Sequence, residues 1–152
     1  MNEPDAGREG QEVRREKWPR IFTLEEANAL LPLVKKTFDW IDERRAELEQ
    51  ISRALEVLEL VATSGASDGS ADHAQYLDAK AHFDSLVEEV QAELTRLTDM
   101  GVVLRDLDQG LVDFHALRNG RVVFLCWKRG EDDLTHWHTV ESGFAGRRPL
   151  DG

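Results

Sequence analysis

The pattern of apolar and polar positions divides the chain into a tail, a helical part and a β part. Residues 1–19 carry many charges and almost no apolar side chains, so we predict a disordered tail there. From residue 23 to about residue 100, apolar residues recur every three or four positions, which is typical of amphipathic helices. After Gly101 the period changes to two, which indicates β-strands.

Two long helices are expected over residues 23–100. Thr23-Leu24-Glu25-Glu26 has the form of a capping box, which predicts a helix that begins there. Pro32 lacks a backbone donor and crowds the preceding turn, so we predict that this first helix is broken near Pro32 and continues as a longer segment. Small and polar residues at 64–72 predict a loop, and a second helix follows from about Ala74 to Asp99. The two helices form an antiparallel hairpin.

The apolar faces of this hairpin are wide. Each helix carries a second row of apolar residues beside its main stripe, which is enough to meet a third layer or a second copy of the chain. The residues that we expect in such an interface are Phe38, Trp40, Phe83, Leu86 and Val90.

Four short strands are predicted after the hairpin, at residues 102–104, 111–117, 121–128 and 134–140. Asn119-Gly120 between two alternating runs predicts a two-residue hairpin turn. The expected fold is therefore α+β: a single domain at residues 20–152, in which the helical hairpin (23–100) packs with a small antiparallel β-meander and a C-terminal arm (101–152).

The turn at Asn119-Gly120 fixes the register of the strands that it joins. If the next loop, Arg129–Asp133, has five residues, the following strand is also placed. The predicted cross-strand pairs are Asp113–Cys126, His115–Phe124, Cys126–His136 and Phe124–His138. A loop one residue longer or shorter turns both histidines of the last strand to the other face.

This register brings imidazole and carboxylate groups onto one face of the sheet, as in a site for zinc or another divalent metal ion. The candidate ligands are His138, Asp113, Glu141, Glu131, His136 and His115. The alternative is that these groups form an ordinary solvated or packed polar face. The outer strands lie roughly 9–10 Å apart across the central strand, which is far for side chains that would bind one ion. Cys126 is expected to be a buried, inert thiol, with a thiol–imidazole pair to His136 as the alternative.

The C-terminal segment Gly143–Leu150 contains two consecutive arginines after two glycines. Arg147 and Arg148 are candidates for binding a small carboxylate or phosphate anion. The alternative is an arm anchored by Phe144 and Leu150, whose arginines pair with acidic helix faces.

Composition narrows the classes of partner. Among 152 residues, 30 are acidic and 19 basic, which gives a net charge of -11 and opposes binding to nucleic acid or to an anionic membrane. The single cysteine excludes an intramolecular disulfide and a zinc site made of cysteines alone. No signal peptide or membrane-length apolar run is present, so a cytoplasmic location is expected.

Several segments together resemble a bacterial family called domain of unknown function 2203. They are Phe22–Pro32, Gly110–Phe114, Leu125-Cys126-Trp127, Trp137-His138 and Gly143–Arg147. The resemblance covers nearly all of the chain after Arg20, and it implies a small cytoplasmic bacterial protein without an assigned activity. His115 stands where the family pattern has proline. The resemblance therefore favours Asp113, Glu131, Trp137, His138, Glu141 and Arg147 as site residues.

Three hypotheses for the function follow. The first is a structural or protein-interaction domain that self-associates through its helices as a homodimer. The second is a divalent-metal-binding domain, with a metal-dependent hydrolase as its enzymatic form, centred on His138. The third is a small-anion binder that uses Arg147 and Arg148. The sequence does not decide whether the protein is an enzyme, and it identifies no small-molecule ligand.

Overall fold

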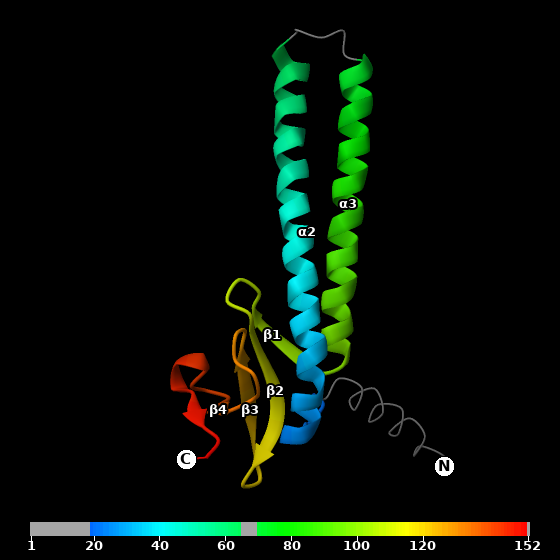
Figure 1. Ribbon diagram of the computed structural model, residues 1–152. Coiled ribbons are helices and arrows are strands. Elements are labelled where there is room, and N and C mark those ends of the chain that lie inside the picture. Colours follow the sequence, from blue (N-terminus) through cyan, green and yellow to red (C-terminus); the bar gives the residue numbers. More distant parts are fainter. Residues whose placement is uncertain (1–18, 65–69, 152) are drawn as a thin grey trace, which may run out of the picture. The chain divides into compact units, whose positions relative to one another are not determined.

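The computed structural model describes residues 19–64 and 70–151, and the elements confirm the expected α+β class. The predicted tail lies outside these residues except for Pro19. The chain divides into two compact units, one formed by Leu30–Asp99 and the other by the described residues on either side of that span. The elements are α2 (Leu24–Ser64), α3 (Ser70–Asp99), β1 (Val102–Asp106), β2 (Leu111–Arg118), β3 (Arg121–Lys128), β4 (His136–Thr139), the 3-10 turn η1 (Phe144–Gly146) and β5 (Arg148–Pro149) (Figure 1).

The first helix begins as predicted, but it is not broken. At the start of α2 the Thr23 hydroxyl accepts from the Glu26 backbone at 3.1 Å, and the Glu26 carboxylate accepts from the Thr23 backbone at 2.9 Å. The predicted break near Pro32 is wrong, because α2 continues through this residue to Ser64. Leu31 and Val34 on either side are completely buried. Burial of each contributes roughly 1.5–3 kcal/mol, and together they outweigh the cost of about 3 kcal/mol for proline within a helix.

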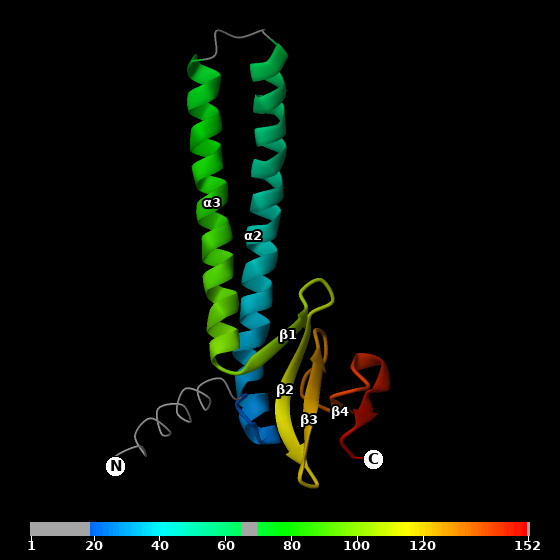
Figure 2. The same cartoon turned by 180° about the vertical axis from the view of Figure 1, so that it is seen from behind.

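The helices α2 and α3 run antiparallel and side by side (Figures 1 and 2). The predicted loop at residues 64–72 was too long, because α2 includes Ser64 and α3 already begins at Ser70; residues 65–69 lie outside the described part. Ion pairs join the helices, from Arg44 to Glu89 and from His82 to Glu47.

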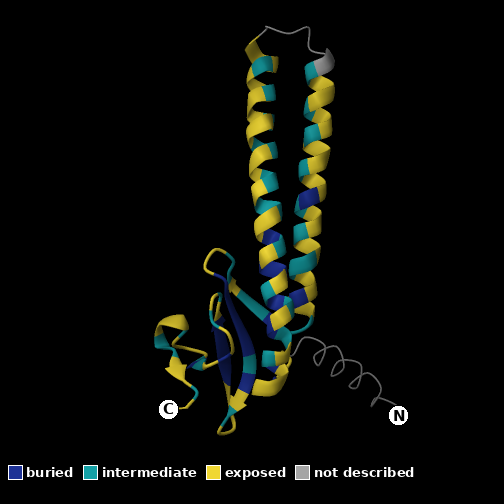
Figure 3. Cartoon of the chain, viewed as in Figure 1, coloured by how far each residue is buried: buried dark blue, intermediate teal, exposed yellow. Residues whose placement is uncertain are grey.

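Burial along the hairpin is uneven. The buried apolar residues lie in the first part of α2 and the second part of α3, while later positions of α2 are half-buried or exposed (Figure 3). Of the five expected interface residues, Phe38 and Leu86 are buried within the single chain and Trp40, Phe83 and Val90 are half-buried. Self-association stays a prediction.

The strands form one antiparallel sheet in the order β1-β2-β3-β4-β5 (Figure 2). The turn at Asn119-Gly120 has positive φ at both residues, 54° and 78°, as a primed hairpin turn requires. The predicted register is confirmed across both hairpins, including the pairs of β4 with β3 that depended on a five-residue loop. β4 is shorter than predicted, and the two-residue strand β5 was not predicted.

One face of the sheet is apolar and buried, as the alternation predicted. Its members are Val112, Phe114, Ala116, Val123, Leu125 and Trp127. Phe22 covers part of this face, because its ring contacts Phe114 edge-on at 5.2 Å and its backbone N–H donates to the carbonyl of His115.

Asn28 in the first turns of α2 holds the segment that leads into β4. Its side-chain oxygen accepts a hydrogen bond of 2.9 Å from the backbone N–H of Leu134, a residue with only 3% exposure. The bond spans 106 positions of sequence and fixes the chain two residues before β4. Asn28 therefore helps to position the histidines of that strand.

The C-terminal arm is held by Arg147. Its guanidinium donates to the Glu131 carboxylate at 2.7 Å and to the carbonyl of Cys126 at 3.2 Å. The backbone of Leu150 also donates to Thr135. An arm is confirmed, but the expectation that Arg147 pairs with an acidic helix face is wrong: its partner is in the loop between β3 and β4. Burial alone would raise the pKa of Glu131, but the hydrogen bonds from Arg147 and from the Lys128 backbone lower it overall.

Neither helix contains a stretch long and apolar enough to cross a membrane, within the residues that the structure describes.

We expect Asn28→Ala to destabilise the fold by about 1–3 kcal/mol, because it leaves the buried N–H of Leu134 without an acceptor. Asn28→Asp keeps an acceptor oxygen and should restore most of the loss. Urea unfolding followed by circular dichroism measures both, with the exposed Gln91→Ala as control, expected within about 0.5 kcal/mol of wild type. Equal stability of Asn28→Ala and the control would contradict the anchoring role.

We expect the stabilisation from the Glu131–Arg147 pair to depend on pH. The folded-state pKa of Glu131 lies below its usual 4.5, so the contribution is complete above that value and disappears as the pH falls below it. Glu131→Gln should therefore cost about 1–3 kcal/mol near neutral pH, and this cost should shrink steadily as the pH is lowered from 4.5 through the folded-state pKa. A series of unfolding measurements from neutral to acid pH tests this, with the exposed Glu56→Gln as control. A pH-independent cost would refute the ionic origin.

Candidate metal centre

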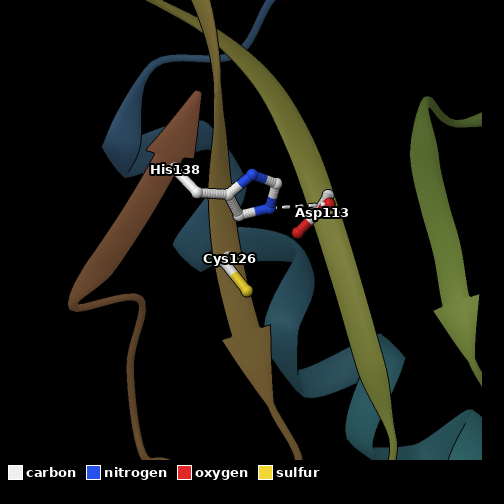
Figure 4. A group of neighbouring side chains, drawn as sticks. All are labelled: Asp113, Cys126 and His138. Carbon is white, nitrogen blue, oxygen red and sulfur yellow. Dashed lines mark hydrogen bonds and ion pairs between the residues drawn. The ribbon is translucent and has the colours of Figure 1, made fainter. Parts of the chain in front are cut away.

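Three side chains from adjacent strands meet on the face of the sheet opposite to the apolar one. Asp113 of β2, Cys126 of β3 and His138 of β4 are 2%, 1% and 2% exposed. Each offers one ligand atom, and these atoms all lie within 4.8 Å of one another (Figure 4). Asp113 and Cys126 are directly paired, whereas His138 pairs with Phe124 and reaches Asp113 diagonally across β3.

Hydrogen bonds fix the orientation of the His138 ring. Its Nδ1 lies 2.9 Å from the backbone carbonyl of Thr139, and its Nε2 lies 3.0 Å from Oδ2 of Asp113. A carbonyl oxygen only accepts, so Nδ1 must be the donor. In the neutral ring, Nε2 then carries the lone pair and faces Asp113; only the doubly protonated ring donates to both groups. Metal-binding histidines usually have this arrangement, with the second ring N–H given to a carbonyl.

Asp113 is a buried carboxylate with unequal oxygens. Oδ2 accepts from Nε of Arg105 at 2.8 Å and faces His138 at 3.0 Å. Oδ1 is buried and has no hydrogen-bond partner in the part of the chain that the structure describes. A buried carboxylate oxygen without a donor is costly, so this atom is suited to a further cationic partner.

Cys126 is a protonated thiol at neutral pH. Burial, together with the negative charge of Asp113, raises its pKa to about 12. This excludes a standing thiolate nucleophile and agrees with the inert thiol expected from the sequence. A divalent cation in contact with the sulfur would deprotonate it, because metal coordination favours the thiolate strongly.

A cavity of about 240 Å³ adjoins the three groups. Its charged lining residues are Asp113, Arg105 and Glu141, and its apolar ones include Leu111, Val140 and Phe144. The side chain of Arg105 is 45% exposed and stacks on the ring of Phe124 at 4.7 Å, so it extends from the buried carboxylate toward solvent. A small molecule in this cavity would contact the candidate ligands directly.

The structure sorts the six predicted metal ligands into separate places. His138 and Asp113 come together, and Glu141 is exposed but lines the adjoining cavity. Glu131 is bound to Arg147, and His136 contacts Thr135 at 2.9 Å and Glu131 at 3.8 Å.

His115, the remaining predicted ligand, stacks on Phe124 at 4.6 Å, and its Nδ1 is buried without a partner among the described residues. Burial and the nearby positive charge of Arg105 lower its pKa, although Asp113 opposes the shift. It therefore favours the neutral form.

Two residues of the centre were missed as site residues by sequence reasoning. Cys126 was already paired with Asp113 in the predicted register, and this adjacency was the signal that could have identified it as a candidate ligand, although an inert thiol was expected from the sequence. Arg105 had no such signal, because the register of β1 shifts between Leu104 and Asp106. The predicted anion pair is also separated: Arg147 binds Glu131, while Arg148 lies over the ring of Trp137.

Comparison with known proteins agrees with the resemblance seen in the sequence. The model of the family described as an uncharacterized conserved protein (DUF2203) matches residues 20–150. No curated protein matches the chain, and no solved structure does. Since the match covers most of the chain, this protein belongs to the DUF2203 family, to which no activity is assigned.

Proposed function

We propose that this protein binds a divalent metal ion through Asp113, Cys126 and His138. The observation that supports this most strongly is the convergence of three buried ligand atoms, of three different chemical types, within 4.8 Å of one another beside a cavity. Direct strand pairing places Asp113 beside Cys126. His138 pairs with Phe124 instead, and its side chain reaches Asp113 across β3.

The spacing of the ligand atoms fits a small coordination sphere. Two ligands bound about 2.0–2.1 Å from a tetrahedral ion lie about 3.3 Å apart. The three candidate ligand atoms lie within 4.8 Å of one another, so side-chain adjustments would bring them to the spacing of a tetrahedral site. Arg105 holds Oδ2 and offsets part of the negative charge, which leaves Oδ1 of Asp113 as the oxygen without a partner.

The donor set indicates which metal is favoured. One nitrogen, one oxygen and one sulfur form a borderline-soft site, which suits Zn²⁺ better than Mg²⁺ or Ca²⁺. Three protein ligands leave a fourth tetrahedral position, as in catalytic zinc sites. The adjoining cavity supplies space for water or substrate at that position.

A metal-free explanation exists for part of this arrangement. Arg105, Asp113 and His138 can act as a buried polar network that only stabilises the sheet, because Arg105 compensates the carboxylate and His138 adds charge only in its protonated form. In that network the thiol of Cys126 is only a protonated neighbour of Asp113, and Oδ1 of Asp113 has no hydrogen-bond partner among the described residues. The two explanations therefore differ in what they predict for Cys126.

We expect untagged protein purified without chelator to contain close to one zinc per chain by elemental mass spectrometry. Cobalt substitution should give a thiolate-to-cobalt charge-transfer band. His138→Ala should lose the metal, and Cys126→Ser should lose the band. His136→Ala is the matched control, because this histidine lies on the same strand and binds Thr135 instead. Chelation should lower the melting temperature of wild type and leave that of His138→Ala unchanged.

The ion-network explanation gives opposite results. It predicts no metal in any variant, no cobalt band, and a Cys126→Ser protein that behaves like wild type, while His138→Ala still loses stability. These results would refute the metal site. Metal retained by His138→Ala would also refute it, because the ion would then be bound elsewhere.

Ester hydrolysis is a second candidate function, favoured by the position of Glu141 on the same cavity. A bound metal would supply a more acidic water molecule. The role of Glu141 would be to accept a proton from the water that adds to the ester carbonyl carbon, and to return it to the leaving-group oxygen when the bond between that oxygen and the carbonyl carbon breaks.

We expect the zinc-loaded protein to hydrolyse p-nitrophenyl acetate faster than the chelator-treated protein. Glu141→Gln should reduce the rate by roughly 10²–10⁴-fold, the range for loss of a general base, without loss of zinc. Glu56→Gln serves as the control, because this carboxylate is exposed on α2 and does not line the cavity. Equal rates with and without zinc, or an unaffected Glu141→Gln, would rule out this role.

A further inference from the structure

A second cluster lies on the other face of the sheet, around Trp137. Successive residues of a strand point to opposite faces, so Trp137 of β4 faces away from the candidate metal centre that holds His138. Trp137 pairs with Leu125 on one side and with Arg148 of β5 on the other. Arg118 and Arg148 lie over its ring and Arg121 lines the same cavity, although the chain as a whole has a net charge of -11.

The arginines reach this place from two directions. Arg118 and Arg121 are directly opposite each other across the turn at Asn119-Gly120. The guanidinium of Arg118 lies 4.6 Å from the centre of the Trp137 ring, and that of Arg148 lies 5.5 Å from it. Like charges directly opposite on a sheet are destabilising, so the arrangement has a cost that a bound anion would remove.

These residues line a cavity of about 550 Å³. No carboxylate lines it, and its polar groups are the three guanidiniums, the Asn119 amide, the Thr139 hydroxyl and the Trp137 indole. The indole N–H is buried and has no hydrogen-bond partner among residues 19–64 and 70–151. Over the same range, Arg121 and Arg148 form no ion pair. Arg121, Arg148 and the Trp137 indole therefore offer positive charge and a donor that no ion pair or hydrogen bond among these described residues satisfies.

We propose that this cavity, the Arg118–Arg121–Arg148 site, binds the phosphate groups of a small polyphosphate-bearing molecule. Planar guanidinium groups match pairs of phosphate oxygens, and three of them match an anion with more than one negative charge. The Trp137 ring already has two guanidiniums over it, so a nucleobase gains no free aromatic surface there. The phosphates, free or attached to a nucleoside, are the recognised part.

The test is isothermal titration of the chelator-treated protein with pyrophosphate and, separately, with ADP. Working without divalent ions prevents pyrophosphate from acting by removing metal, so the result is independent of the proposed metal site. Chloride at matched ionic strength corrects for non-specific charge effects. Arg121→Gln and Arg148→Gln are the site variants. Arg53→Gln is the matched control, because Arg53 is an exposed arginine of α2.

We expect saturable binding of both ligands, weakened at least tenfold, or about 1.4 kcal/mol, by each site variant and unchanged by Arg53→Gln. Similar affinity for pyrophosphate and ADP identifies the phosphates alone as the ligand. Tighter binding of ADP with the same arginine dependence supports the site and makes the nucleotide its source. No saturable binding beyond that in chloride, or binding that survives both site variants, would overturn the proposal.

Discussion

Strand register is the constraint on which both candidate sites depend. The side chains of a strand alternate between faces, so a shift of one residue between β3 and β4 would exchange His138 for Trp137. The turn at Asn119-Gly120 sets the first register through two residues with positive φ, and the segment 129–135 between β3 and β4 sets the second. Asn28 fixes the end of that segment through the backbone of Leu134. The helix start and the sheet therefore cooperate in placing one histidine.

Burial of the charged Asp113 carboxylate is the largest free-energy cost of the candidate metal centre. Removing a carboxylate from water costs several kcal/mol unless opposite charge and hydrogen bonds compensate it. Arg105 and His138 both approach Oδ2, so the compensation is concentrated on one oxygen. Oδ1 has no hydrogen-bond partner among the described residues, and the neighbouring thiol stays protonated although the charge of Arg147 opposes the rise of its pKa. A divalent ion would complete the compensation and convert the thiol to a ligand.

Local chemistry made much of the fold predictable, because the capping box at Thr23, the turn at Asn119-Gly120 and the two hydrophobic periods each act over a few residues. The break expected at Pro32 was wrong because burial of Leu31 and Val34 is a tertiary effect, invisible to a local rule for proline. In the same way, residues 70–72 have loop composition but belong to α3.

The candidate site was predictable only as far as direct cross-strand pairs. Pairing places Asp113 beside Cys126, but the contact of His138 with Asp113 crosses an intervening strand and depends on sheet twist and on the side-chain rotamer. In a flat sheet, β2 and β4 on either side of β3 would be too far apart for this contact. Arg105 was not predictable at all, because the irregular pairing after Leu104 changes where the next side chain points.

The C-terminal arm shows why two adjacent arginines need not act together. Arg147 has extended backbone angles, φ −55° and ψ 139°, and in extended chain neighbouring side chains point to opposite sides. Arg147 accordingly binds Glu131 and the carbonyl of Cys126, next to the metal centre, while Arg148 lies over Trp137 on the other face. One short arm therefore supports one candidate site through a structural ion pair and contributes a binding group to the other. The arm also pairs with β4 through Trp137–Arg148 and His136–Pro149, so the same backbone segment meets both faces of the sheet.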